Sequence, residues 1–252
     1  MVIPAKDDAV ALRRCLDALA RQTRMADEVI VVDNGSSDDT AEVARSWGAV
    51  VIEQLEPGIP AAAAAGYDAA RFDVIARLDA DSIAPPRWIA NGLRRLDADD
   101  SLTAVTGPGF FYDGPARGSR LIAAVYLGAY FGSIRLALLT TPLFGSSFFL
   151  RRAAWTEVRG VVHVTGLNLH DDLDLTMHLT PEHRIGFDAA VRVGISYRPF
   201  TRRGTVPLRL RRGLHTFVAN WPRSSSIVRW RGALLGLADS RQRGAQGRGV
   251  SQ

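Results

Sequence analysis

The sequence predicts an α/β fold: a mixed, mainly parallel sheet flanked by helices, with a less regular second half. Through the first hundred residues, short runs of β-branched residues alternate with segments of helical period. This alternation is typical of strands that are buried on both faces and joined by crossover helices. The 252 residues, 47% hydrophobic and 23% charged, are enough for a full-sized core. A single cysteine, Cys15, excludes an internal disulfide and a cysteine-rich zinc site, so hydrophobic burial must hold the fold together.

The first half is expected to alternate regularly between the two kinds of element. The chain starts three residues before Pro4, so we expect either a short first strand or a start that is placed too late. The following elements are predicted, in order, as a helix at Leu12–Leu19, a strand at Glu28–Asp33, a helix at Asp38–Trp47, a strand at Ala49–Glu53, a helix at Pro60–Ala70, a strand at Asp73–Asp79 and a helix opened by Pro85 and Pro86. Ligands of such sheets bind beyond the carboxyl ends of the strands.

The rhythm changes after about residue 100. We expect a strand entering a Gly/Pro turn at Leu102–Phe111, an apolar segment at Leu121–Leu150, a strand turning into a helix at Gly145–Trp155, and a helix opened by the acidic cluster His170–Asp174. No linker rich in Pro, Gly or Ser divides the chain. The prediction is therefore one domain over residues 1–197, with halves at 1–100 and 101–197, followed by an arginine-rich helical extension at 198–252.

The apolar segment raises the question of membranes. Arg135 and Pro142 interrupt it, and the uncharged runs on either side are shorter than the ~20 residues of a spanning helix, so we do not expect it to span. A buried pair of helices or an amphipathic surface against a bilayer remain the alternatives.

Charge is distributed unevenly along the chain. From Arg198 to the end there are twelve arginines and one acid, Asp239, although the net charge of the whole chain is only +5. Such a segment suits phosphate-bearing partners, namely nucleoside diphosphates, anionic lipids or nucleic acid. The start of the chain lacks the apolar run of a secretory signal, so we expect a cytoplasmic location and leave open a peripheral position at the membrane.

Two motifs follow predicted strands. Asp79 and Asp81 end the run VIARLDAD, and on an extended strand their carboxylates would share one side, which suits Mg²⁺ or Mn²⁺ with phosphate oxygens completing the shell. The run VVDNGSSDDT places Asp33 and Asn34 where a nucleoside would lie. Glycine fingerprints of dinucleotide-binding and P-loop proteins do not occur, so phosphates must be neutralised by metal and arginine.

These motifs, in their order along the chain, resemble the family 2 nucleotide-sugar glycosyltransferases, which have the GT-A fold. The resemblance covers roughly residues 2 to 190 and rests on five segments: VIPAKDD, VVDNGSSDDT, ARLDAD, FGSSFFLRRAAW and HDDLDLTMHL. It implies that residues 1–100 form the nucleotide-binding half and residues 101–197 the acceptor half. It also implies a nucleoside-diphosphate sugar as donor, an activating Mg²⁺ or Mn²⁺, and a hydroxyl acceptor.

The resemblance assigns roles to residues of both motifs. Pro4, Asp33 and Asn34 would surround the nucleoside, with the Asn34 amide oxygen accepting a hydrogen bond from a base N–H. Asp81 would be the direct metal ligand, and Asp79 a ribose contact or a ligand to a metal-bound water. The metal would stabilise the departing diphosphate.

The acidic cluster resembles the family's Glu-Asp motif at a helix start, and Asp172 is then the candidate base of an inverting transfer. The sequence departs from the family at Ala63 and Ala64, where relatives usually carry an Arg-Asn pair. Arg77 or an arginine of the extension would have to replace the donor-binding arginine. The usual Gln-x-x-Arg-Trp pattern is also missing.

Other readings remain open. The same residues would serve a retaining GT-A transferase or a nucleotidyltransferase, and the alanines would also suit a catalytically silent relative that acts as a binding module. The five histidines show no metal-binding spacing, and His170 and His178 are read as ordinary polar positions. Nucleic acid is not expected as a partner, because no nucleic-acid-binding motif occurs. An acceptor that is lipid-linked or membrane-associated is the hypothesis drawn from the apolar segment and the arginines.

Overall fold

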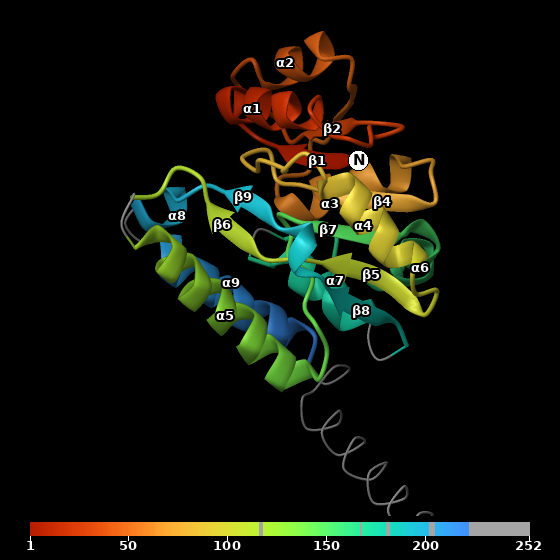
Figure 1. The fold of residues 1–252 in the computed structure, drawn as a ribbon, viewed down its shortest axis with the longest axis vertical. Coiled ribbons are helices and arrows are strands. Elements are labelled where there is room, and N and C mark those ends of the chain that lie inside the picture. The colour runs from red at the N-terminus through yellow and green to blue at the C-terminus, as the bar shows by residue number, and fades with distance from the viewer. Residues whose placement is uncertain (116–117, 167, 180–181, 202–204, 222–252) are drawn as a thin grey trace, which may run out of the picture.

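The predicted α/β architecture is present (Figure 1). The structure is a computed structural model that describes residues 1–115, 118–166, 168–179, 182–201 and 205–221. Its main sheet has seven strands in the order β3-β2-β1-β4-β7-β5-β8. These strands are β1 (Val2–Ala5), β2 (Ile30–Asp33), β3 (Val50–Glu53), β4 (Val74–Arg77), β5 (Leu102–Thr106), β7 (Phe148–Arg151) and β8 (Arg184–Phe187).

Strand β7 is antiparallel to its two neighbours, β4 and β5, and every other neighbouring pair in this sheet is parallel. The chain moves outward from β1 to β3 and then returns to place β4 on the other side of β1. Strands β1 and β4 pair only at Val2 and Arg77, whereas β1 and β2 pair along their whole length. The strand order therefore reverses at β1 and β4, which is where sheets of this type hold their ligands.

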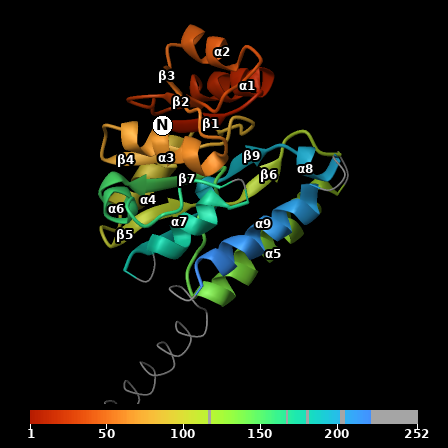
Figure 2. The same ribbon diagram turned by 180° about the vertical axis from the view of Figure 1, so that it is seen from behind.

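Helices cover both faces of this sheet (Figures 1 and 2). One face carries α1 (Ala9–Leu19), α2 (Thr40–Ser46) and α4 (Trp88–Asp97), and the other carries α3 (Ile59–Ala69), α6 (Arg152–Val158) and α7 (Asp171–Leu179). Side chains along the strands alternate between the two layers: Ile3 packs into the first core cluster and Val2 into the second. Cys15 is buried in the first cluster, as its helical spacing predicts.

Gly66 brings α3 close to β1. A Cβ added at this glycine would lie 2.3 Å from Val2 Cγ1. Ala63 and Ala64, on the same helix, are buried in the cluster between α3 and the sheet. The two positions at which the resemblance predicts an Arg-Asn pair therefore face the core in this chain.

The strand predicted at Asp73–Asp79 was wrong in its extent. Strand β4 ends at Arg77, and Asp79 opens a turn in which the Ser82 amide donates to the Asp79 carbonyl at 3.0 Å. The segment 102–111, predicted as a strand entering a Gly/Pro turn, forms β5, a break at Gly107 and Pro108, and then β6 (Gly109–Phe111). At Gly107 a Cβ would lie 2.3 Å from the Val191 carbonyl oxygen, so the close approach of backbone requires a glycine there.

Strand β6 belongs to a second, two-stranded sheet with β9 (Val193–Ile195), and the two strands are parallel. A short 3₁₀ helix, Ala189–Val191, precedes β9. Ile83, directly after the Asp79 turn, forms a two-way backbone bridge with Gly194 of β9, with N–O distances of 2.8 and 2.9 Å. This bridge ties the turn of Asp79 and Asp81 to the chain just ahead of Arg198.

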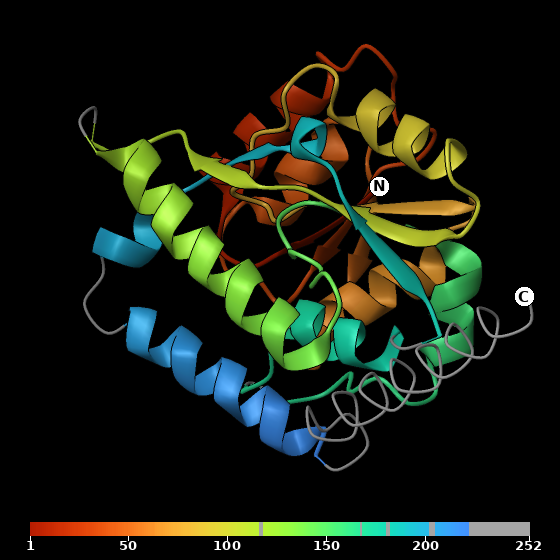
Figure 3. The same cartoon turned by 60° about the horizontal axis from the view of Figure 1, so that its bottom comes forward.

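The apolar segment contains one long helix, α5 (Ser119–Leu138), which is followed by a loop and then by β7. The alternative of a buried pair of helices was wrong, because only 22% of the window Leu121–Leu138 is buried. That window has a mean hydropathy of 1.6 and passes as a membrane span by length and composition alone, which is weak evidence. Two further helices, α8 (Arg198–Thr201) and α9 (Thr205–Ala219), complete the described part, and α9 runs beside α5 (Figures 1 to 3).

Predictions for residues 222–252, including the end of the arginine-rich extension, lie outside the described residues. The boundary at residue 198 stays a prediction. The strands of both predicted halves join one sheet.

Candidate active site

Polar side chains from the loops after β1, β2 and β4 meet at one edge of the sheet. Lys6 Nζ donates to the Asn34 and Gly35 carbonyl oxygens, at 2.9 Å each. Asp7 accepts hydrogen bonds from the backbone and side chain of Ser37, at 2.7 and 3.0 Å. The two loops therefore hold each other in place at the carboxyl ends of β1 and β2.

The predicted nucleoside residues lie within this edge. Pro4 is buried in β1 opposite Val32, where β1 no longer pairs with β4, so its missing N–H leaves that side of the ladder intact. Asp33 is buried at the end of β2 and accepts from the Ser36 amide at 3.2 Å.

Asn34 is engaged by the protein itself. Its amide nitrogen donates to the carbonyl oxygens of Gln54 and Glu56 at 2.8 and 2.7 Å, and its amide oxygen accepts from the Gly58 N–H at 2.7 Å. These contacts make Asn34 the brace of the loop between β3 and α3. Its direct contact with a base stays a prediction.

Arg77 lies at the centre of the site, with only 1% of its side chain exposed. Its Nη1 donates to the Tyr67 hydroxyl at 2.8 Å and to Asp171, and its Nη2 donates to Asp79 Oδ1 at 3.0 Å. Burial opposes the charge of Arg77, but Asp171 and the neighbouring Tyr67 and Asp79 raise its pKa well above the ordinary value. The guanidinium thus joins the turn after β4 to the start of α7.

Asp79 and Asp81 form hydrogen bonds with different partners. Asp79 accepts from Arg77 and, through Oδ2, from the Ser146 hydroxyl at 2.6 Å. Asp81 accepts from Arg198 Nη2 at 2.6 Å. Burial and then the charge of Asp79 raise the pKa of Asp81.

Arg198 is a site residue that sequence reasoning missed, because it was counted as the start of the arginine-rich extension. Arg198 forms a bidentate ion pair with Asp8, with N–O distances of 2.9 and 2.7 Å, in addition to its hydrogen bond with Asp81. Hydrogen bonds to Asp113 from Ser196 Oγ and the Tyr197 amide hold the chain just before it. The motif VIPAKDD contained Asp8, but no local signal joins it to a residue 190 positions later.

The ion pairs of this edge leave negative charge in excess. Two guanidinium groups, Arg77 and Arg198, are paired with four carboxylates. The carboxylates are Asp8, Asp79, Asp81 and Asp171. Hard oxygen donors with two unbalanced negative charges, one of them on a carboxylate whose pKa is raised, fit a divalent cation such as Mg²⁺ or Mn²⁺.

Asp172 is buried in the first turn of α7. Its Oδ2 accepts from the Gly145 amide at 2.8 Å and from the Tyr130 hydroxyl at 3.5 Å, and its Oδ1 accepts from the Leu173 amide at 2.8 Å. Burial and then the charge of Asp171 raise its pKa. A carboxylate with a raised pKa and a fixed orientation is suited to general base catalysis.

A second cluster lies outside this edge. Ligating atoms of His163, Asp174 and His178 are within 4.8 Å of one another, a grouping that the sequence spacing did not reveal. Both oxygens of the buried Asp174 already accept hydrogen bonds, Oδ1 from His163 Nδ1 and Asn220 Nδ2, each at 2.8 Å, and Oδ2 from the His163 amide at 2.9 Å. The cluster therefore serves as a hydrogen-bonded joint between α7, α9 and the preceding loop.

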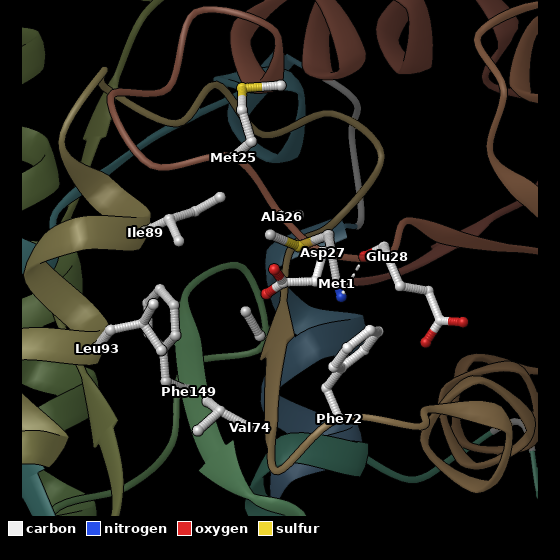
Figure 4. A pocket seen from close by; sticks show the side chains of 11 residues that line it. Met1, Met25, Ala26, Asp27, Glu28, Phe72, Val74, Ile89, Leu93 and Phe149 are labelled. Atoms are coloured by element: carbon white, nitrogen blue, oxygen red, sulfur yellow. Dashed lines mark hydrogen bonds between the residues drawn. The ribbon is translucent and has the colours of Figure 1, made fainter.

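Figure 4 shows a pocket at the other end of β1, beside the chain start. Met1, Met25, Phe72, Leu93 and Phe149 contribute to its mostly apolar lining. This pocket is remote from the aspartates at the carboxyl ends of the strands, so a ligand in it would not contact them.

Comparison with known proteins identifies the family. The model of a family described as "Glycosyl transferase family 2" matches residues 1–159. The chain belongs to glycosyl transferase family 2. The glycosyltransferase AglE of Haloferax volcanii is 33% identical over 104 residues, which cover 38% of this chain and 34% of that protein. The chondroitin synthase of Escherichia coli is 31% identical over 120 residues, or 45% of this chain and 17% of that protein. This family 2 chain thus aligns with about a third or less of the length of either relative.

Solved structures share the fold of this family 2 chain. A mannosyltransferase from Pyrobaculum calidifontis, solved with GDP-Man and Mn²⁺, gives a TM-score of 0.65 at 21% identity, covering 86% of this chain and 62% of that one. Glucosyl-3-phosphoglycerate synthase from Mycobacterium tuberculosis, solved with Mg²⁺ and UDP, gives 0.59 at 21% identity, covering 84% and 77%. The expected GT-A fold is confirmed.

Proposed function

We propose that the protein transfers a sugar from a nucleoside-diphosphate sugar to a hydroxyl acceptor, with inversion and with the aid of Mg²⁺ or Mn²⁺. The observation that carries the proposal is that one buried arginine, Arg77, bonds both to Asp79, in the turn that also carries Asp81, and to Asp171, the neighbour of Asp172, at the switch point of a family 2 fold. The solved neighbours named above contain GDP-Man with Mn²⁺ and UDP with Mg²⁺, which supports this class of donor and cation.

The cation would be held by Asp81 and Asp79, and when bound it supplies positive charge for the departing diphosphate. Asp79 is oriented for this by Arg77 and Ser146. Asp33 and the Pro4 segment of β1 would line the nucleoside, as the resemblance implies. The buried Arg77, whose terminal nitrogens already bond to protein, acts here as a positioning residue for both motifs rather than as a ligand of the diphosphate.

Asp172 would take the proton of the acceptor hydroxyl. The Gly145 and Leu173 amides fix the direction of its carboxylate, and its raised pKa makes it a stronger base than an ordinary aspartate. Gly145 matters for the fit, because a Cβ at this position would lie 3.2 Å from Asp172 Oδ2. Attack from the side opposite the diphosphate would invert the anomeric centre.

Calorimetric titration with UDP, GDP and dTDP sugars, each with and without Mn²⁺, tests donor binding. We expect one nucleotide to bind only with Mn²⁺, and Asp81→Ala to abolish that binding. Asp100→Ala is the matched control, because Asp100 is a fully exposed aspartate away from this site. Binding by Asp81→Ala at unchanged affinity would contradict the proposal, and absence of any nucleotide binding would favour a silent relative.

The anomeric configuration of the product distinguishes the inverting transfer from a retaining one. A nucleotidyltransferase would instead release pyrophosphate. The proposal includes an acceptor that is lipid-linked or membrane-associated, and a peripheral position of the protein at the cytoplasmic face of a membrane. Helices α5 and α9, which pack near Asp172, support both parts.

A further inference from the structure

Helices α5 and α9 lie side by side along one flank of the molecule, away from α1 and α2 (Figures 1 and 3). They are joined through a small core that includes Ile134 and Leu138 of α5, Met177 of α7 and Phe217 of α9. The outward sides of both helices form what we call the α5–α9 face. It is made of the exposed residues Leu121, Val125, Arg135, Leu136, Leu208, Leu210, Arg211, Leu214, Val218 and Trp221.

Helix α9 has its polar side turned inward. Thr216 and Asn220 are buried, and they bond to the His170 amide and to Asp174 at 2.9 and 2.8 Å. The opposite side carries a stripe of apolar residues at intervals of four, four and three positions, which is the spacing of a single helical face. The stripe consists of Leu210, Leu214, Val218 and Trp221, which are 72%, 68%, 63% and 52% exposed.

Helix α5 presents a similar side. It buries Ala123, Leu127, Ile134 and Leu138 at helical spacing against the protein. The other side exposes Leu121, Val125 and Leu136. All residues from Leu121 to the one before Arg135 are uncharged. Two neighbouring helices thus expose leucine and valine side chains on one flank, an arrangement that marks an interaction site.

The charge of this face identifies its partner. Neither α5 nor α9 contains an aspartate or glutamate, whereas the face carries the exposed Arg135 of α5 and Arg211 of α9. Apolar side chains flanked by arginines complement the acyl chains and anionic head groups of a bilayer. A second copy of the chain on the same face would bring these arginines against one another.

We propose that the α5–α9 face docks on an anionic lipid bilayer, with both helices lying in the plane of the interface. The docking itself does not depend on the transfer reaction. Combined with the proposed function, it explains the acceptor, because Tyr130 of α5 contacts Asp172 and the His170 ring bonds to the Arg209 carbonyl of α9 at 2.9 Å. The candidate base thus contacts α5 directly, and His170, two residues before it, contacts α9. On this basis the acceptor hydroxyl is borne by a lipid.

Flotation of the full chain with vesicles tests the proposal. We expect binding to vesicles of phosphatidylcholine with phosphatidylglycerol, and little binding to phosphatidylcholine alone. L210E/L214E should weaken binding by about tenfold or more, since two leucines leave the apolar phase. R211Q should weaken it by about fivefold at low salt and less at high salt. V10E is the matched control, because Val10 is 71% exposed on α1, and it should bind as the parent does.

Circular dichroism and nucleotide calorimetry accompany each variant, so that unfolding is recognised. Equal binding by the parent and L210E/L214E, or no binding by the parent, would overturn the proposal. So would resistance to alkaline carbonate extraction, which indicates a spanning helix, or a lipid-free dimer that L210E/L214E dissociates. Vesicle binding without nucleotide binding would refute the proposed transfer and support the docking. Nucleotide binding without vesicle binding would refute the docking and support the proposed transfer.

Discussion

Replacing Arg77 with methionine tests the arrangement at the centre of the site. Methionine keeps the length of the side chain and removes the guanidinium, so Asp171 and Asp79 are left facing each other without their shared cation. Removing one partner of a fully buried ion pair costs about 3–5 kcal/mol. Asp79 is 37% exposed, so water screens part of this cost. We expect a loss of about 3 kcal/mol in the free energy of unfolding at neutral pH.

Urea denaturation followed by tryptophan fluorescence measures this loss. The double variant R77M/D171N removes the carboxylate that Arg77 neutralises most strongly, so it should recover about half of the loss. Asp100→Asn, at an exposed position, should rescue nothing.

The alternative role of Arg77 gives the opposite pattern. If it bound the diphosphate of the donor, as the sequence suggested, R77M would abolish nucleotide binding and change the unfolding free energy by less than about 1 kcal/mol. A loss of that small size, or no recovery in R77M/D171N, would refute the positioning role derived from its burial and contacts.

Three further predictions concern neighbouring positions. Asp172→Asn should lower kcat by about 10²–10⁴-fold while nucleotide binding is retained, and an unchanged kcat would exclude this base. In the parent protein, kcat should begin to fall on acidification at a higher pH than the pKa of an ordinary aspartate, because the pKa of Asp172 is raised and the base is protonated earlier. Arg198→Gln frees Asp81, so the thermal stabilisation by Mn²⁺ should increase, and a decrease would show that Arg198 assists the cation. Gly66→Ala should destabilise the fold by about 1–3 kcal/mol in urea denaturation, because the added Cβ meets Val2, and a neutral result would contradict that close packing.

Much of the fold could be predicted from local patterns. Strand β2 lies within the predicted 28–33, and α7 begins at the acidic cluster as expected. Such elements follow from β-branched runs buried on both faces and from apolar residues at helical spacing. Errors arose where backbone contacts decide, as after Arg77, where β4 ends and the Ser82 amide bonds to the Asp79 carbonyl in a turn.

The site could be predicted only in part, because its long-range pairing has no local signature. The motifs located Asp79, Asp81 and Asp172, and the structure brings the segments that carry them to Arg77. Nothing in the sequence near Arg198 indicates that it reaches Asp81, 117 positions earlier. The inward polar side of α9 likewise depends on Asp174 and His170, which come from another part of the chain.

The most direct test of the proposed chemistry is ³¹P nuclear magnetic resonance of the bound nucleoside diphosphate as Mn²⁺ is added. A cation held by Asp79 and Asp81 against the diphosphate predicts broadening of both phosphorus signals beyond that of Mn²⁺ and nucleotide alone in the parent protein and in Asp100→Ala, and no broadening beyond that reference in Asp81→Ala. Equal broadening in the parent protein and Asp81→Ala, beyond that of Mn²⁺ and nucleotide alone, would place the cation elsewhere and contradict the claim.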